Sequence, residues 1–397
     1  MVRLGKAYKK GHGVERSITK AVELFRRAAS NGDSDALVEL GHCYENGTGV
    51  EIDQDRAMNL YKRAAGQGNG DAMYSIGCMF FNGRGVSRNK RIGIQWWRKA
   101  SEHGSIEAMN SLSDYYQSCD YLYKERGRAI HFEEMAAQKG NEVSMVKLAR
   151  RYEEGDGVEV DLDHAYDLYK RAFHFSAGSS EPLKQLTVFK KPMTMIDVLE
   201  RLAQRGHIEA QYTLGVCYGT GNHVTQDWKK AFEMFENAAK GGHIEALFMM
   251  GRCFDNGYGV KQDMAKAFKW YLKSAKNGSV DAMFIVGYRY SNGQGVPQSK
   301  AEAFQWYLKA ADNGDVDAMN SVGICYDDGD GIAQDKKTAF EWFLKAAEKG
   351  NADAMNSVGQ CYEKGVGVAQ DGTLAHEWYL KAAKKDMWCF HSRQGME

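Results

Sequence analysis

The sequence predicts an all-α protein, a solenoid of about ten helix–loop–helix repeats of 36 residues each. Three observations support this fold class. A Gly-x-Gly pair recurs at a constant spacing, apolar side chains between the pairs follow a helical period, and a hydrophobic share of 43% is sufficient for a buried core. A single unit of this kind cannot bury its apolar face, so stacking of neighbouring units must form the core.

The Gly-x-Gly pair marks the loop of each unit. It occurs at Gly11/Gly13, Gly47/Gly49, Gly83/Gly85, Gly155/Gly157, Gly257/Gly259, Gly293/Gly295, Gly329/Gly331 and Gly365/Gly367. A half-kept copy ends at Gly221, and the fourth unit has Ser118-Cys119-Asp120 in place of the pair. Because glycine tolerates positive φ, we expect each pair to form the loop between the two helices.

Residues 315–350 show how one unit is built. An apolar stripe at spacing i, i+4, i+8 indicates the first helix: Ala318, Val322 and Tyr326. Gly323 lies on the same side and would let the paired helix approach closely. Asp335 is a suitable N-cap for the second helix, and Gly350 is expected to end it.

The same signature is complete around residue 250. It reads Ala246…Gly251…Phe254…Gly257-Tyr258-Gly259-Val260…Asp263, followed by Lys266-Ala267-Phe268-Lys269-Trp270-Tyr271-Leu272-Lys273. This pattern resembles the Sel-1-like repeat family, which is related to tetratricopeptide repeats, and the resemblance covers nearly the whole chain. It implies a right-handed superhelix and a role as adaptor or scaffold.

The repeats divide the chain into four regions. We expect N-terminal repeats over 1–172, the first shortened and the fourth degenerate, then an insertion over 173–202, C-terminal repeats over 203–384 and a tail over 385–397. In the insertion we expect a loop followed by a helix from about Met193 to Gln204. Because the insertion breaks the 36-residue spacing and contains Pro182 and Pro192, we expect it to be dispensable for folding.

Composition narrows the class of partner. Lys plus Arg equals Asp plus Glu at 52 each, and no basic stripe stands out, which argues against nucleic acid. No stretch reaches the length of a membrane span, and no signal peptide is visible. Five cysteines share one position of the repeat and would lie too far apart for disulfides: Cys43, Cys217, Cys253, Cys325 and Cys361. We therefore expect buried thiols and a cytoplasmic location.

Motifs that carry chemistry are missing from the sequence. It contains no phosphate-binding loop, no His-Glu-x-x-His and no Cys-x-x-Cys element. Cys389 and His391 lie close together, but two ligands do not make a zinc site. We expect neither an enzyme nor a bound metal or cofactor.

The positions at which repeats differ are the candidate binding site. Residues 2, 6 and 9 after the Ala of each first helix face away from its apolar stripe. In related architectures this face lines the concave groove, and here it carries Tyr74, Phe81, Tyr212, Phe248, Arg252, Phe284 and Tyr288. Aromatic residues with an Arg are typical interface anchors. A second interpretation stays open, in which tight coiling buries these rings as core.

Two further sets of equivalent residues contrast with this one. Later repeats carry a more polar strip on the same face: Asn320, Ile324, Asn356 and Gln360. One position of the second helix keeps the same residue in several repeats, at Trp96, Trp270, Trp306, Trp342 and Trp378. Equal residues at equal positions indicate framework rather than a site.

The sequence therefore favours a non-enzymatic scaffold or adaptor that binds a peptide or partner protein on the concave face. Two alternatives remain. One is a regulatory or activator subunit of a membrane-associated enzyme complex, which the resemblance allows. The other is an enzyme that uses the insertion near 173–202 as a lid, against which the missing catalytic motifs count.

Overall fold

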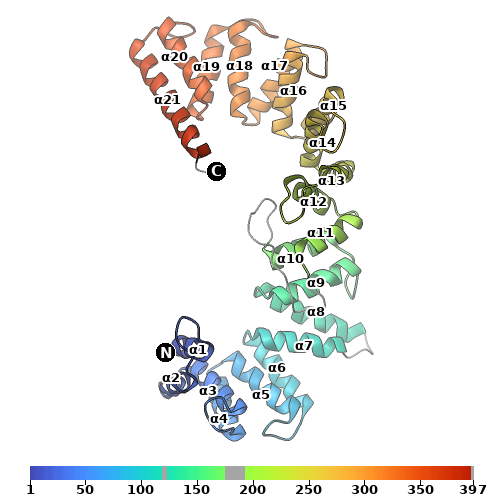
Figure 1. Cartoon of the computed structure of the whole chain (residues 1–397), viewed down its shortest axis with the longest axis vertical. Coiled ribbons are helices and arrows are strands. Elements are labelled where there is room, and N and C mark those ends of the chain that lie inside the picture. The colour runs from blue at the N-terminus through green and yellow to red at the C-terminus, as the bar shows by residue number, and fades with distance from the viewer. Residues whose placement is uncertain (119–122, 175–192, 395–397) are drawn as a thin grey trace. The chain divides into compact units, whose positions relative to one another are not determined.

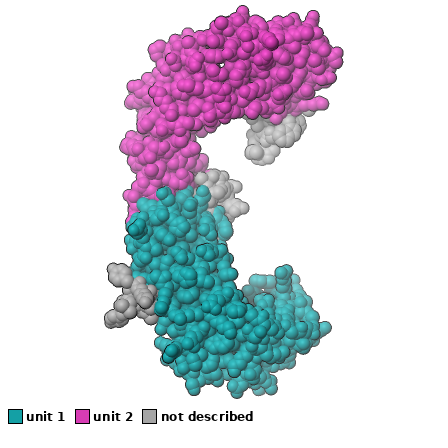
Figure 2. Space-filling view, turned by 180° about the vertical axis from the view of Figure 1, so that it is seen from behind, with its two compact units in different colours: residues 1–175, 183–195 teal, residues 176–182, 196–397 magenta. Residues whose placement is uncertain are grey.

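The computed structural model describes residues 1–118, 123–174 and 193–394, which form 21 helices and no strand (Figure 1). The chain divides into two compact units. The first comprises residues 1–175 and 183–195, and the second residues 176–182 and 196–397 (Figure 2). Within each unit, consecutive helices pack against one another, so the predicted all-α solenoid is confirmed.

Nearly all helices that lie wholly within the described residues have the same length. The first unit contains α1 Val2–Lys10, α2 Ile18–Ser30, α3 Ser34–Asn46, α4 Gln54–Gly66, α5 Gly70–Asn82, α6 Lys90–Glu102, α7 Ile106–Ser118, α8 Tyr123–Gln138, α9 Glu142–Glu154 and α10 Leu162–Phe173. The second contains α11 Met195–Gln204, α12 Ile208–Thr220, α13 Trp228–Lys240, α14 Ile244–Asn256, α15 Met264–Lys276, α16 Val280–Asn292, α17 Lys300–Asp312, α18 Val316–Asp328, α19 Lys336–Glu348, α20 Ala352–Lys364 and α21 Gly372–Gln394.

Side-chain caps and glycines set the helix ends. The Asp335 carboxylate accepts hydrogen bonds from the backbone of Lys337 and Thr338, which confirms it as the N-cap of α19. Hydrogen bonds from the Thr338 side chain and backbone lower the pKa of Asp335. At the end of α18, Gly329 has a φ of 77°, and its N–H bonds to the Cys325 carbonyl. These local signals set where the helices of a repeat begin and end.

A missing Cβ lets the two helices of a repeat touch. A Cβ built on Gly323 would lie 2.6 Å from the Phe343 ring of α19, closer than real contacts allow. Seven other first helices carry the same contact 20 residues apart, at 2.4–2.7 Å: Gly5/Phe25, Gly41/Tyr61, Gly77/Trp97, Gly215/Phe235, Gly251/Tyr271, Gly287/Tyr307 and Gly359/Tyr379. The expected close approach at Gly323 is thus a general feature of the stack.

The second glycine of the loop joins one repeat to the previous one. A Cβ on Gly295 would lie 2.2 Å from the backbone oxygen of Met264, and one on Gly331 would lie 2.2 Å from that of Lys300. Gly259 and Gly367 meet the preceding second helix in the same way, at 2.0 and 2.1 Å. In these four repeats of the second unit, the first glycine of the pair ends a helix and the second permits backbone contact between repeats.

The fourth repeat replaces the glycine–aromatic contact with a buried ion pair. Ser113 and Glu133 occupy the two positions, 20 residues apart, and the Ser113 hydroxyl donates to the Glu133 carboxylate at 2.8 Å. Arg151 of α9 donates to the same carboxylate through Nε at 2.6 Å, and both charged side chains are nearly fully buried. Arg151 also bonds to Asp156 at 2.8 Å. Hydrogen bonds thus satisfy the buried charges, as such a site requires.

The burial of helix α11 argues against the interpretation of residues 173–202 as a dispensable insertion. Residues 175–192 lie outside the described residues, but α11 begins at Met195 and ends at Gln204, close to the predicted span. Met195, Leu199 and Leu202 are fully buried. They lie 36 residues before Ala231, Phe235 and Ala238, which are the buried residues of α13. By its spacing, α11 is therefore the second helix of a shortened repeat, and its apolar side chains belong to the core.

Substituting the close-contact glycine tests the packing of a repeat. We expect Gly41→Ala to destabilise the chain by about 1–3 kcal/mol, because the added methyl group would overlap the Tyr61 ring. Gly66→Ala is the matched control, since a Cβ there meets no atom within 4 Å. It should be neutral or stabilising by up to about 1 kcal/mol. Urea unfolding followed by circular dichroism compares the two, and equal stabilities would contradict the packing role.

Truncation within α11 tests whether this helix belongs to the core. We expect Leu199→Ala to reduce the free energy of unfolding by about 2–5 kcal/mol, because it leaves a cavity at a fully buried position. Leu380→Ala, at a leucine that is 47% exposed, should change it by less than about 0.5 kcal/mol. Thermal melting measures both. If Leu199→Ala melts like wild type, residues 193–202 are dispensable after all.

Candidate functional site

The residues expected on the concave face all lie on first helices, but in different units. Tyr74 and Phe81 belong to α5 of the first unit, whereas the other five belong to α12, α14 and α16 of the second. Arg252 and Tyr288 are exposed, and the five remaining side chains are half-buried. The set therefore consists of exposed side chains next to rings that are shared between surface and core.

In the second unit, each half-buried ring covers an aromatic ring of the paired second helix. The ring centroids of Phe248 and Tyr271 lie 5.4 Å apart. Phe284 and Tyr307 lie 5.7 Å apart, and Tyr212 and Phe235 lie 6.1 Å apart. Tyr212 also stacks on His243, the N-cap of α14, at 4.3 Å. One side of each first-helix ring thus packs against the core. The other side is exposed together with Arg252 and Tyr288, and we call this surface of the first helices the first-helix face.

In the first unit, Tyr74 and Phe81 both pack against Trp97. The Phe81 and Trp97 centroids lie 4.5 Å apart, and those of Tyr74 and Trp97 lie 6.1 Å apart. The Tyr74 hydroxyl also lies 3.1 Å from the Ser111 hydroxyl. Burial raises the pKa of Tyr74 to about 12. These contacts give Tyr74 and Phe81 a clear packing role.

The exposed residues of the second unit form a series at one repeat position. Arg252, Tyr288 and Ile324 lie 36 residues apart on α14, α16 and α18, and Gln360 continues the series on α20. Tyr288 is 47% exposed and Ile324 43% exposed. Ile324 also lines a cavity of about 290 Å³ with Asp327, Gln360 and Lys364. Ile324 belongs to the polar strip expected from the sequence, but its exposed apolar side chain extends the aromatic series.

Lysines cover the repeated tryptophans of the second helices. The Lys309 ammonium lies 4.4 Å from the Trp306 ring centroid, and Lys345 lies 4.5 Å from that of Trp342. The same pairing links Lys99 to Trp96, Lys273 to Trp270 and Lys381 to Trp378, at 5.3, 5.2 and 3.9 Å. In each case the lysine lies three residues after the tryptophan on the same helix and covers its ring in a cation–π contact.

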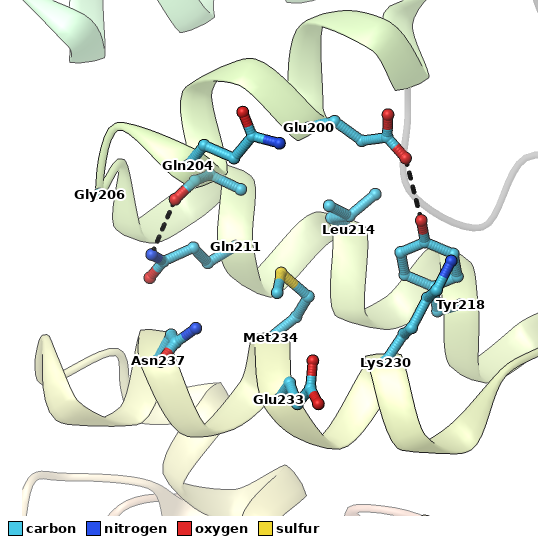
Figure 3. Close-up of a pocket in the computed structure, with 11 residues that line it drawn as sticks. Glu200, Gln204, Gly206, Gln211, Leu214, Tyr218, Lys230, Glu233, Met234 and Asn237 are labelled. Carbon is cyan, nitrogen blue, oxygen red and sulfur yellow. Dashed lines mark hydrogen bonds between the residues drawn. The ribbon is translucent and has the colours of Figure 1, made fainter.

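A cavity of about 610 Å³ opens between α11, α12 and α13 (Figure 3). The Tyr218 hydroxyl donates to the Glu200 carboxylate at 3.0 Å, and the Lys230 ammonium lies 5.0 Å from the Tyr218 ring centroid. Met234 and Asn237 line it at the positions where later repeats have the Trp–Lys pair. The absence of the Trp–Lys pair from α13 is the sequence signal that could have located this cavity.

The described residues offer little for metal or nucleophilic chemistry. Among them, no group of three His, Cys, Asp or Glu side chains could hold a metal ion. Burial raises the pKa values of the Cys217, Cys253 and Cys325 thiols to about 11, the opposite of an activated nucleophile. In the described part of the chain, no helix has the length and apolar character needed to cross a membrane.

The repeat geometry defines the protein as an α-helical repeat protein, and comparison with known families identifies which one. The Sel1 repeat matches nine segments that cover most of the chain: 1–33, 34–69, 70–105, 143–173, 208–243, 244–279, 280–315, 316–351 and 352–387. The chain therefore belongs to the Sel1 repeat family. The unmatched residues contain the repeat with the buried ion pair and the shortened repeat of α11.

Similar solved structures include other proteins of this kind. One is a protective antigen of uropathogenic Escherichia coli strains with an SLR fold, 27% identical over 99% of this chain and 78% of that chain, with a TM-score of 0.45. Another is a Sel1 repeat protein from Oxalobacter formigenes, 26% identical over 84% and 90%, with a TM-score of 0.45. A third is an immunity protein from Pseudomonas aeruginosa, 20% identical over 60% and 81%, with a TM-score of 0.33. Comparison with curated proteins finds no match.

Thiol reactivity tests the state of the cysteines. The six described cysteines are unpaired thiols, and five of them are buried. We expect all eight cysteines of the chain to react under denaturing, non-reducing conditions, and the buried thiols to react slowly in the native protein. Recovery of a stable bridged pair would contradict this.

The raised thiol pKa values also predict a pH dependence of stability. In the folded chain Cys217, Cys253 and Cys325 stay protonated up to about pH 11, whereas their usual pKa is 9.0. Their contribution to stability is therefore complete below pH 9.0 and declines as the pH rises towards 11. Replacing the three cysteines by alanine should weaken this alkaline decline, which melting at pH 8 and pH 10 measures.

Proposed function

We propose that the chain is a non-catalytic scaffold that binds a segment of a partner protein along the first-helix face of its second unit. Sel1 repeat proteins generally serve as protein-interaction scaffolds, which supports the class of function. The observation that carries the proposal is the exposed series Arg252, Tyr288 and Ile324, at one position of three successive repeats. Exposed apolar side chains at equivalent positions of successive repeats are candidate parts of an interaction surface.

The chemistry of this series indicates what kind of segment would bind. Tyr288 and Ile324 offer apolar area, and the half-buried rings of Phe248 and Phe284 extend it. Core contacts hold those two rings in place, so little conformational entropy is lost when a partner covers them. Arg252 can form paired hydrogen bonds with a carboxylate. The favoured partner is therefore an extended or helical segment with apolar anchors and an acidic residue.

Exposed residues make the cleanest test because their loss leaves the fold intact. Peptides selected by display on the wild-type chain would be measured for binding to Tyr288→Ala and Arg252→Ala. Loss of an anchor residue costs about 2 kcal/mol, so we expect about thirtyfold weaker binding. Leu380→Ala is the matched control, because Leu380 on α21 and Tyr288 have the same exposed fraction, 47%.

Melting of each variant separates a lost surface from a lost fold. Tyr288→Ala and Arg252→Ala should change the free energy of unfolding by less than about 0.5 kcal/mol, as is usual for exposed positions. Weaker binding with unchanged melting supports the proposed face. Selected peptides that bind equally well to wild type, Tyr288→Ala and Arg252→Ala would place the binding surface elsewhere.

A further inference from the structure

The cavity of Figure 3 lies within the second unit, between the second helices α11 and α13 and beside the first helix α12. Its volume of about 610 Å³ falls in the range of small-molecule sites, about 300–1,000 Å³. Because the chain is a repeat, each residue that lines this cavity has equivalents in later repeats, 72, 108 and 144 residues further along. Comparison with these equivalents shows which features belong to this cavity alone.

Later repeats fill the equivalent space with a tryptophan. The equivalents of Met234 are Trp306, Trp342 and Trp378. Trp306 is only 8% exposed, so neighbouring side chains cover nearly all of its ring. In α13 the smaller Met234 has this position, and Asn237 replaces the lysine that covers the ring in later repeats. The cavity therefore has room for a planar ring that the later repeats supply from their own sequence.

A buried amide faces this cavity in place of an apolar side chain. Gln211 of α12 has methionine as its equivalent in later repeats: Met283, Met319 and Met355. The Gln211 residue is 9% exposed, and its Nε2 donates to the Ala203 carbonyl at 3.0 Å. Because a carbonyl can only accept, this bond identifies the other amide atom as the oxygen.

The Gln211 oxygen is available to a ligand. It has no hydrogen-bond partner among the described residues, and Figure 3 shows this amide between Gln204 and Asn237. A nearly buried acceptor without a partner is unfavourable, and an N–H group of a bound molecule would pair it. The cavity therefore favours a ring that carries an N–H donor.

Two carboxylates give the lining a net negative charge. Glu200 and Glu233 line the cavity together with one cation, Lys230. Glu200 accepts a hydrogen bond from Tyr218, and the Lys230 ammonium lies over the same ring at 5.0 Å from its centroid. Glu233 is exposed and has neither a hydrogen bond nor an ion pair with a described residue. Its carboxylate is thus free to pair with a cationic group of a ligand.

The position of Glu200 adds to this difference. Its equivalents in later repeats are leucines: Leu272, Leu308 and Leu344. The cavity has therefore exchanged leucine for a carboxylate, methionine for an amide and tryptophan for a smaller side chain. All three exchanges make it a better site for a polar aromatic ligand than its equivalents.

From these observations we propose that the cavity between α11 and α13 binds a small planar aromatic molecule that carries a ring N–H group and a positive charge. The ring would occupy the space of the absent tryptophan, against Leu214 and Met234, whose thioether suits contact with an aromatic ring. The N–H group would donate to Gln211, and the cation would pair with Glu233. This site is separate from the first-helix face and does not depend on its role.

Calorimetric titration of the full chain with three probes tests the proposal. Tryptamine carries an indole ring with its N–H group and an ammonium group. The second probe, 1-methyltryptamine, lacks the N–H group, and the third, indole-3-propionate, has a carboxylate in place of the ammonium group. We expect tryptamine to bind, and each of the other two to bind at least about tenfold more weakly, because each loses one polar contact. Either of them binding as tightly as tryptamine, or no binding of tryptamine at about 5 mM, would overturn the proposal.

Substitutions that restore the residues of later repeats assign the binding to this cavity. Met234→Trp fills the space from within and should weaken tryptamine binding more than about tenfold. Gln211→Met removes the acceptor and should weaken it about tenfold. Both variants should melt close to the wild-type temperature, because later repeats carry these residues at the same positions. Gln211→Met keeps the test valid if the added ring of Met234→Trp destabilises the fold.

Leu60→Trp is the matched control. Leu60 is the half-buried residue of α4 that has the position of Met234 in α13, so the same indole ring is added to the first unit. It should change tryptamine binding less than about twofold. Wild-type affinity in Met234→Trp, or equal weakening by Met234→Trp and Leu60→Trp, would reject the site.

Discussion

The close contact between a glycine of the first helix and an aromatic ring of the second is the constraint on which the rest of the stack depends. A side chain at Gly251 would occupy the space of the Tyr271 ring. With the two helices held this close, the aromatic ring becomes the centre of the repeat. The half-buried rings of the first-helix face, such as Phe248, then rest on it. The same aromatic ring therefore packs against the glycine in the core and supports the rings of the candidate surface.

Unit 1 shows what happens when this contact is replaced. Ser113, Glu133 and Arg151 fill the fourth repeat with buried charge, and such a pair is rarely more stable than a well-packed apolar contact. Its hydrogen bonds join α7, α8 and α9 through one carboxylate. A cavity lined by Lys90, Arg91, Arg98 and Arg128 lies between this repeat and the preceding one. The departure from the repeat pattern and this group of cationic side chains therefore coincide in this part of the chain.

Much of the fold could be predicted from the sequence, because glycine spacing and caps are local signals. The period, the N-cap at Asp335 and the close approach at Gly323 all follow from residues within one unit. Helix α11 was expected from the sequence, but its packing was not, because a spacing of 30 residues concealed that Leu199 has the position of Phe235. The partial burial of Phe248 and Phe284 depends on how far a ring of the paired helix reaches across them. The angular position of a residue around its own helix does not predict that. The cationic cavity joins side chains of α6, α7 and α8 and has no single-helix signature.

The second loop glycine makes the spacing between repeats independent of the residues on the first-helix face. At Gly295 and Gly331 the loop meets the backbone oxygen of the preceding helix, so main-chain atoms set the distance between repeats. The side chains at the positions of Arg252, Tyr288 and Ile324 take no part in that contact, so they do not affect the distance. We therefore expect a loop–helix segment of one of these repeats to keep its register when it is grafted at the equivalent position of another. Binding specificity in such a chain can be rewritten by reordering its units.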